Sequence, residues 1–598
     1  MSRRAGLAVL LSCFVALAAA VVPWRVSSDA LRSAVSARLH EIAGLKLTAA
    51  GTATLAILPV PRLAFEAVTL TSANGTPVAR GGTLRGELRI LPLLAGRLQF
   101  AELALTGATI DIELDDDPYN LPDRAVAALS ARLDPAGARS HVARLVVNAA
   151  GLRLHHRRTG FATVVHDIHV AAEWPTPNGP LEATGSMTWR GEIIQIRGAS
   201  IRPDALAAGR ASPVRIDVST PLAGLTLAGE LRLREGRHLV GRAAFATRSL
   251  RDFSIWSGLP LPLSEFVGAF GLDGDVRIDR QGASWPAVRL TLGQDKLDGA
   301  LSWRGEGGRA IVTSTLAADR LDLTGLAAAL ARLRSASGGW SADGFHPPAQ
   351  GGTDLDLRLS AATARIGSVR LDDVAANLSV KPGRAEMSVN RATLNKGVAK
   401  GRALLMSGGD GLEIKAQSTF ERLDAAGLLA DLGLPRWASG SAQGQLAIEG
   451  SGDNPAELVG SLHGRAQMTI RGGELVGIGL ADLLRRRDAR DDATPVLWQG
   501  GRTPFDQVSV QMAIVDGVAT INDAKLSGSG VRAALQGRTS LVHRTVAAKA
   551  SVEATLASSG APSSIILDIT GPLSKPTVVH GVRSHPQSAD AAAPIAVQ

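Results

Sequence analysis

Residues 508–521 read VSVQMAIVDGVATI, and this stretch has the pattern of a β-hairpin. An Asp-Gly pair, Asp516 and Gly517, divides it, and Asp-Gly is a favoured two-residue hairpin turn. Alternation of apolar and polar residues gives a strand one buried and one solvated face, as in antiparallel sheets. Before the turn, the apolar positions are Val508, Val510, Met512 and Ile514. We therefore expect antiparallel β-structure around this stretch.

The same period of two recurs through most of the chain after Gly44. Clear examples are residues 110–114, 214–218, 227–233 and 355–359. Helical patches are short, and they lie at residues 26–43, 124–133, 322–334, 423–432 and 478–486. A sheet with many strands, of about five to seven residues each, must curl, split or wind up. The sequence therefore predicts a mainly β fold: a long, curled antiparallel β-sheet groove with a few short helices.

Two prolines, Pro59 and Pro61, interrupt one of the first apolar stretches, TATLAILPVPRLAFEAVTL at residues 52–70. Proline cannot donate a hydrogen bond to a sheet ladder, so it belongs at strand ends, edges or bulges. We expect this stretch to be a sheet edge or the place where a sheet begins.

The composition favours an aliphatic core in a solvated, arginine-rich protein. The 598 residues are 45% hydrophobic but only 4% aromatic, and the net charge is +9. The arginines are scattered along alternating strands and are not interleaved with aromatic residues, which argues against a nucleic-acid partner. The one cysteine, Cys13, lies in the N-terminal apolar run, which excludes disulfides and Cys-ligated zinc.

The N-terminus predicts a membrane anchor. After the cytoplasmic tip, residues 1–4, the run AGLAVLLSCFVALAAAVV contains 18 uncharged residues. At about 1.5 Å per residue it would just cross a bilayer core. Arg3 and Arg4 favour a cytoplasmic N-terminus, so we expect a transmembrane helix over residues 5–24. The alternative is a cleaved signal peptide with Ala18-Ala19-Ala20 as the cleavage site. Both interpretations export the rest of the chain.

No pattern of catalytic or metal-ligating residues stands out. The sequence has no Gly-x-Ser-x-Gly, His-Glu-x-x-His or P-loop motif. The acidic run at residues 115–117, followed by Asn120, lacks the spacing of an EF-hand. Four histidines lie close together in the sequence: His155, His156, His166 and His169. In a strand, residues that are one or three positions apart point to opposite faces, so these histidines are not expected to converge on a metal ion. We expect no enzyme activity, no cofactor and no metal site.

The apolar face of the sheet is then the candidate functional feature. If the sheet curls without closing, this face forms a trough that suits acyl chains, and the alternative is an ordinary packed core. The candidate lining residues are Leu231, Leu233, Leu355, Leu357, Leu359, Val510, Met512 and Ile514.

The order of several short motifs resembles the AsmA family of bacterial envelope proteins. The early motifs are a Leu-Pro break, a Val-Thr-Leu strand and a Pro-Leu-Leu-x-Gly turn. The matching positions are Leu58, Pro59, Val68, Leu70, Pro92, Leu93, Leu94 and Gly96. Later stretches, RGGELVGIGLADLLRR at 471–486 and ILDITGPLSKPTVV at 566–579, also resemble the family. The chain departs from the family where Asn120 is followed by Leu121 instead of tryptophan.

The resemblance implies an anchor in the bacterial inner membrane and a periplasmic β-rich body related to bridge-like lipid transfer proteins. Pro59 and Pro61 would then mark the start of the groove, and membrane phospholipids would be the partners. The alternative function is non-enzymatic assembly of outer-membrane proteins through exposed strand edges. The expected regions are an N-terminal β-rich region, a linker, a C-terminal β-groove region and a disordered tail, at residues 25–334, 335–353, 354–580 and 581–598.

Overall fold

The computed structural model is mainly β, and strands account for 69% of it. This confirms the predicted mainly β fold with a long curled sheet and few helices. Among the residues that the structure describes, no helix is both long enough and apolar enough to cross a membrane. The predicted anchor lies outside these residues except for Trp24. The structure describes residues 24–25, 29–58, 60–72, 77–95, 98–114, 142–156, 162–176, 178–233, 238–259, 261, 264–265, 267–306, 309–335, 338–345, 353–408, 411–431, 436–485, 500–555, 564–573 and 576–580.

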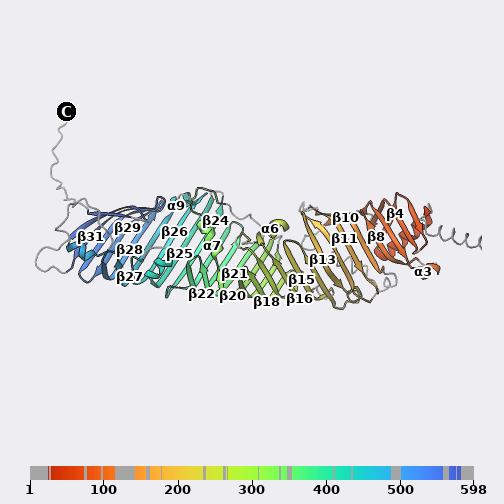
Figure 1. Ribbon diagram of the computed structural model, residues 1–598, viewed down its shortest axis with the longest axis horizontal. Helices are drawn as coiled ribbons and strands as arrows, with labels where there is room; N and C mark the ends of the chain where they lie inside the picture. Colours follow the sequence, from red (N-terminus) through yellow and green to blue (C-terminus); the bar gives the residue numbers. More distant parts are fainter. Residues whose placement is uncertain are drawn as a thin grey trace, which may run out of the picture. The chain divides into compact units, whose positions relative to one another are not determined.

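The chain divides into two compact units. Figure 1 labels helices and strands of both. Unit 1 comprises Met1–Gln294 and Asp298–Val312, and unit 2 comprises Asp295–Leu297 and Thr313–Gln598. Two strands supply residues to both units, β19 (Asp295–Glu306) and β20 (Arg309–Asp322).

Unit 1 begins with four strands that are each broken in the middle. The broken strands are β2 (Leu45–Ala49) with β3 (Ala53–Ala56), β4 (Arg62–Glu66) with β5 (Val68–Ser72), β6 (Pro77–Arg80) with β7 (Thr83–Leu88), and β8 (Phe100–Thr106) with β9 (Thr109–Leu114). The halves pair into two lobes, β3–β4–β7–β8 and β2–β5–β6–β9. A short strand, β1 (Trp24–Arg25), adds to β3. The sheet therefore folds over on itself at the level of the breaks.

Left-handed backbone conformations make three of these four breaks. Ala67 has φ 50°, Gly107 has φ 71°, and Gly81 and Gly82 both have φ 76°. Backbone hydrogen bonds continue across the break, from Gly81 N to Val68 O at 2.8 Å, for example. Glycine reaches this conformation without the steric penalty that a Cβ atom imposes.

The two adjacent glycines give a matched test of the break. A Cβ atom at Gly82 would lie 2.4 Å from Thr106 O, whereas one at Gly81 would meet nothing within 4 Å. We expect Gly81→Ala to lower the free energy of unfolding by about 1 kcal/mol, through backbone strain alone. Gly82→Ala should cost roughly 1–3 kcal/mol more, because β8 must move. Hydrogen exchange in β4, β7 and β8 measures the difference, and equal effects would show that the close approach is unimportant.

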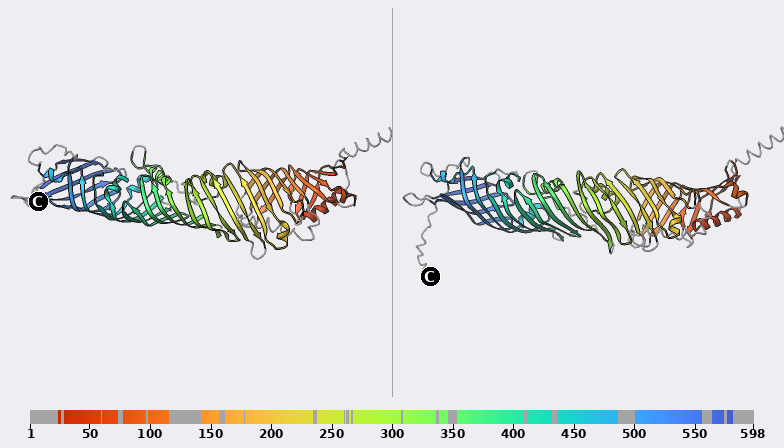
Figure 2. Two further views of the ribbon diagram at one scale, coloured as in Figure 1. Left: turned by 60° about the horizontal axis from the view of Figure 1, so that its bottom comes forward. Right: turned by 90° about the horizontal axis from the view of Figure 1, so that it is seen from below.

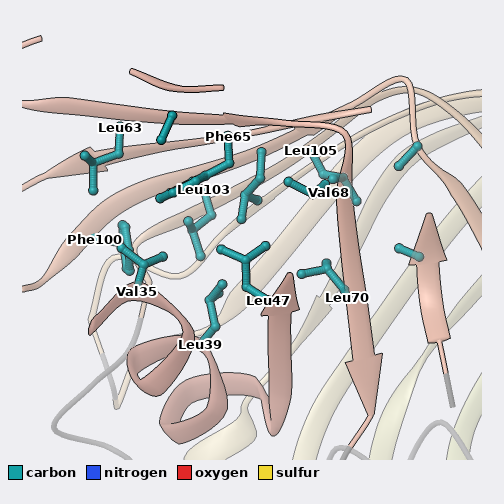
Figure 3. Packing of buried hydrophobic residues seen from close by; sticks show 14 of the residues in the cluster. Val35, Leu39, Leu47, Leu63, Phe65, Val68, Leu70, Phe100, Leu103 and Leu105 are labelled. Atoms are coloured by element: carbon teal, nitrogen blue, oxygen red, sulfur yellow. The ribbon is translucent and has the colours of Figure 1, made fainter. Parts of the chain in front are cut away.

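The helix α2 (Asp29–Ala43) fills the space between the two lobes (Figure 3). It confirms the amphipathic helix predicted at residues 26–43, and its Val35 and Leu39 point into the core. Phe65 and Phe100, each 2% exposed, face them from the strands. The buried members of this N-terminal core are Val35, Leu39, Leu47, Ala53, Leu63, Phe65, Val68, Leu70, Ala79, Leu84, Leu88, Phe100, Leu103, Leu105 and Ala108.

Pro61 lies at a strand end, as its sequence context predicts. It is buried just before β4, and its carbonyl accepts a hydrogen bond of 2.8 Å from Leu88 N. Pro59 lies outside the described residues. Both β3 and β4 have a partner on each side, so this stretch is the inside of a lobe and not its edge.

The rest of unit 1 is a meander with one exception to the predicted antiparallel pairing. β10 pairs in parallel with both β8 and β9, so these three strands run in the same direction. The strands are β10 (Arg144–His156), β11 (Ala162–Glu173), β12 (Leu181–Trp189), β13 (Glu192–Ile201), β14 (Ser212–Ser219), β15 (Ala223–Arg232), β16 (His238–Thr247), β17 (Phe270–Ile278) and β18 (Gly282–Leu292). The short helices are α3 (Ile90–Leu94), α5 (Pro203–Ala207) and α6 (Leu250–Ser257).

Unit 2 is also a curved meander (Figure 2). Most of its strands are longer than the five to seven residues expected, and β21 and β28 each have 14. The strands are β21 (Thr353–Ile366), β22 (Val369–Lys381), β23 (Arg384–Leu394), β24 (Gly397–Gly408), β25 (Gly411–Asp424), β26 (Ser441–Gly452), β27 (His463–Val476), β28 (Arg502–Val515), β29 (Val518–Gly528), β30 (Val531–Ser540), β31 (Thr545–Ala554), β32 (Ser564–Pro572) and β33 (Thr577–His580). The helices are α7 (Thr324–Ala331), α8 (Ala425–Asp431), α9 (Pro455–Gly460) and α10 (Leu480–Arg485).

The hairpin predicted from VSVQMAIVDGVATI is confirmed. β28 and β29 are antiparallel, Val515 pairs with Val518, and Asp516 and Gly517 form the turn between them. Both turn residues have positive φ, 49° and 68°, as a type I′ turn requires. Bulges with positive φ at Asp373 and Arg422 increase the local twist and help the sheet to curl.

Candidate functional site: an apolar face

Unit 2 carries a continuous apolar face on one side of its sheet. In an antiparallel pair, residues directly opposite each other point to the same side, so the register traces a face from strand to strand. One unbroken row of partners consists of Leu357, Leu378, Met387, Ala403, Ala416, Ile448, Gly464, Ile514, Ala519, Thr539, Val546 and Gly571. This row and those on either side of it, through Leu355 and Leu359, define the apolar face of unit 2.

The register joins the candidate residues of two distant strands. The row next to the first begins at Leu359 on β21 and includes Met512 on β28. Its members are Leu359, Ala376, Val389, Gly401, Ser418, Leu446, Ala466, Met512, Ile521, Gly537, Ala548, Ile569 and Val578. Leu355 and Leu357 share the face with Leu359, and Val510 and Ile514 share it with Met512. Six of the eight predicted residues therefore lie on one face.

This face is open over its first strands and closed over its last ones. Met387 is 41% exposed although it lies on the apolar side, and Leu357, Leu446 and Ile448 are half-buried. At the other end, α10 packs its buried Leu480 and Leu484 into a core formed by β25–β33. That C-terminal core comprises Leu423, Ala425, Ala442, Ile470, Leu480, Leu484, Phe505, Leu526, Val531, Val552, Ile565, Leu567 and Val578.

Helix α9 packs on the apolar side, at one margin of the face. Gly450 and Gly452 belong to this face by their spacing from Ile448. A Cβ atom at Gly450 would lie 3.1 Å from Leu458 O, and one at Gly452 would lie 2.5 Å from Leu458 N. These glycines allow the helix to contact the sheet directly.

The segment 323–345, here called the strap, is anchored beside α9. Ser341 O accepts a hydrogen bond of 3.0 Å from Ala456 N, and Phe345 N donates to Asp453 O at 2.8 Å. The β30–β31 turn adds two bonds, from Trp340 Nε1 to Leu541 O at 2.9 Å and from Arg544 Nη1 to Gly338 O at 2.8 Å. Part of the predicted linker, residues 338–345, is therefore attached to unit 2.

The strap runs from one margin of the sheet to the other. Leu323 N donates to Arg365 O at 2.8 Å, and Thr363 Oγ1 donates to Asp319 O at 3.1 Å, so β20 and β21 run side by side in the same direction. A parallel pair needs a connection that returns to the opposite strand end. Because its far end is bonded to α9, the strap lies on the apolar side.

The opposite face of unit 2 is polar and solvated. One of its rows consists of Arg358, Asn377, Ser388, Arg402, Gln417, Ala447, Arg465, Ala513, Thr520, Arg538, Ala547 and Thr570. Ion pairs cross this face, and Glu386 binds Arg402 at 2.6 Å and Arg384 at 3.1 Å. The hydrogen bond from Arg384 holds the pKa of Glu386 below its ordinary value, with help from the charge of Arg402. The charges of the unit are thus concentrated on the side away from the apolar face.

Unit 1 has an apolar face of its own on β13–β18. One row of partners consists of Ile196, Val218, Leu225, Phe245, Leu272 and Leu290, and the row beside it consists of Ala199, Ile216, Leu227, Ala243, Gly274 and Val288. The candidate Leu231 lies on this face, half-buried against Leu239 and Val276. The candidate Leu233 lies beyond the end of β15 and pairs with no strand there.

The motif positions that resemble the family contribute to the N-terminal core instead of an apolar face. Val68 and Leu70 are buried in that core, and Leu93 of α3 packs against it. Leu58 precedes the β3–β4 turn and Pro92 is in α3. Pro59 and Gly96 lie outside the described residues, and so does the side chain of Leu94.

The described part of the chain contains no cluster of His, Cys, Asp or Glu that could hold a metal ion. His155 lies on β10, and the exposed His166 and His169 lie on β11. The acidic run at residues 115–117, with Asn120, lies outside the described residues.

Residues 328–524 match the sequence model of the AsmA family. They cover most of unit 2, from the strap to β29, and include the open part of its apolar face. The comparison with curated proteins found no match.

Proposed function

Because residues 328–524 match the AsmA family model, we propose that the chain is an envelope-biogenesis protein that carries phospholipid acyl chains along its apolar faces. The N-terminal segment would anchor it in the bacterial inner membrane, with the β-rich body in the periplasm. The observation that carries the proposal is the apolar face of unit 2, which is continuous over many strands and open around Met387.

The energetics favour exchange of lipid over tight binding. Removing an acyl chain from water yields about 0.8 kcal/mol per buried CH₂ group. A bilayer offers the same chain a comparably apolar environment, so transfer between bilayer and protein is nearly balanced. The charged headgroup stays in water, because burying it without a partner is costly. This arrangement supports passive movement, in which a gradient or a partner supplies the direction.

The test is mass spectrometry of the lipids that copurify with residues 25–580, exported without the N-terminal segment and isolated without detergent. We expect at least one phospholipid per folded chain. A folded, monodisperse protein that is free of lipid would contradict the proposal and favour the assembly of outer-membrane proteins.

A further inference from the structure

The N-terminal end of unit 1 is filled by packed side chains. Val68 is 0% exposed and Leu63 is 1% exposed, and α2 occupies the space between the two lobes (Figure 3). Removing a large buried side chain from such a core costs about 2–5 kcal/mol. An acyl chain that came in from this end would have to displace several of them. The packed N-terminal core therefore closes this end of unit 1 to an acyl chain.

The apolar face of unit 1 is open at one of its margins. Leu225 belongs to this face through its partners Val218 and Phe245, yet it is 42% exposed. Its strand continues along the face through Leu227 and Leu231, which are half-buried. Leu225 is therefore a point where solvent meets the apolar face directly.

Helix α6 lies at the same margin and is held there by aromatic contacts. The Phe253 ring is 4.9 Å from Phe245, the cross-strand neighbour of Leu225, and the Trp256 ring is 4.9 Å from Trp189. Trp256 Nε1 also donates to Trp189 O at 3.3 Å. In a chain with 4% aromatic residues, this concentration is unusual.

Polar contacts complete the attachment of α6. Ser249 caps its first turn by accepting a hydrogen bond from Asp252 N, and Gly258 ends it with φ 70°. Arg190 Nη1 donates to Trp256 O at 2.8 Å, and its guanidinium lies 5.0 Å from the Trp189 ring centre. The helix is thus fixed in place by its inner side and by both ends.

These contacts do not explain why α6 exposes apolar side chains on its other side. Ile255 is 69% exposed, and Leu259, just after the helix, is 46% exposed. Phe253 joins α6 to Phe245, which is the cross-strand neighbour of Leu225 on the apolar face of unit 1.

We propose that Leu225, Ile255 and Leu259 form a lateral portal through which a phospholipid acyl chain reaches the apolar face of unit 1. The proposal rests on the proposed function and adds the position at which the lipid enters. The exposed Arg248 and Arg251, at the start of α6, suit a headgroup phosphate that remains in water. Asp252 and Glu265 are the exposed acidic groups nearby in sequence.

Photo-crosslinking tests the portal in the full chain in its own membrane. A benzophenone side chain would replace Leu225 or Ile255, and irradiated protein would be analysed for covalent phospholipid. Two positions on the opposite, polar face of the sheet serve as controls. Thr226 is exposed and directly follows Leu225 in the chain. Ile193 is an apolar side chain that is 53% exposed. We expect at least tenfold more lipid adduct at Leu225 and Ile255 than at either control.

A further probe at Met387, on the open face of unit 2, separates the portal from the proposed function. Adducts at Met387 with only background labelling at Leu225 and Ile255 would overturn the portal alone. Background labelling at all three positions would overturn the proposed function as well. Equal labelling at Leu225 and Ile193 would show that any exposed apolar side chain contacts lipid, and would also overturn the portal.

Discussion

The double variant Met387→Asp and Val510→Asp should lose at least tenfold of its copurifying phospholipid. Both side chains lie on the apolar face of unit 2, on strands β23 and β28. A carboxylate in contact with an acyl chain loses part of its hydration without gaining a partner, which costs several kcal/mol. Each 1.4 kcal/mol corresponds to about a factor of ten in affinity. Quantitative mass spectrometry of the detergent-free protein measures the loss.

The matched control places the same two charges on the other side of the same strands. Ser388→Asp and Ser509→Asp are one residue away, on the polar face, where Ser509 faces Lys525. This variant should retain its lipid. Because Met387 is partly exposed and Val510 half-buried, the charged double variant should still fold, as circular dichroism can verify. Equal lipid content in the two folded variants would contradict an acyl-chain role for the face.

Phe100→Ala should destabilise the N-terminal lobes by about 3–5 kcal/mol. The Phe100 ring is 2% exposed and covers Gly86, where a Cβ atom would lie 2.6 Å from Phe100 Cε1. Removing the ring leaves a cavity between β7, β8 and α2 that neighbouring side chains cannot fill. Hydrogen exchange should accelerate in β4 and β7 by roughly 100- to 4,000-fold, since each 1.4 kcal/mol is about a factor of ten.

A second truncation in the same region supplies the control. Leu91 of α3 is 81% exposed, so Leu91→Ala should change stability by less than about 0.5 kcal/mol. Unchanged exchange in the lobes of the Phe100→Ala variant would mean that the Phe100 ring does not hold them together.

The β-faces could be predicted from the sequence because their signal is local. Alternation around Leu355–Leu359 and Val508–Ile514 fixes which side chains share a side, and the Asp516-Gly517 turn fixes the register of its hairpin. The full rows could not be predicted, since many members are Gly or Ala, such as Gly401, Ala466 and Gly537, which are not distinctive. Leu225 lies two residues before Leu227, so the same alternation could have placed it on the apolar face, but it was not among the predicted lining residues.

The two lobes and the short helices could not be predicted from the alternation of apolar and polar residues. The fold-over at Gly81 and Gly107 follows from pairing between strands that are distant along the chain, which no local pattern reveals. The helices α6 and α9 were not predicted because they are short, although each has a recognisable N-cap, Ser249 and Asn454. The aromatic cluster was also missed, because its residues are scattered between 189 and 270 in the sequence.

The attachment of the strap also has a consequence for the order in which unit 2 folds. Each hairpin of the meander pairs residues close in sequence and can form soon after its second strand is available. The strap cannot do so, because its bonds from Arg544 to Gly338 and from Trp340 to Leu541 span 206 and 201 residues. These bonds must wait until β30 and β31 have been synthesised. The strap can therefore complete its docking only after β31 is present, and until then it is held on the apolar side by its bonds to α9.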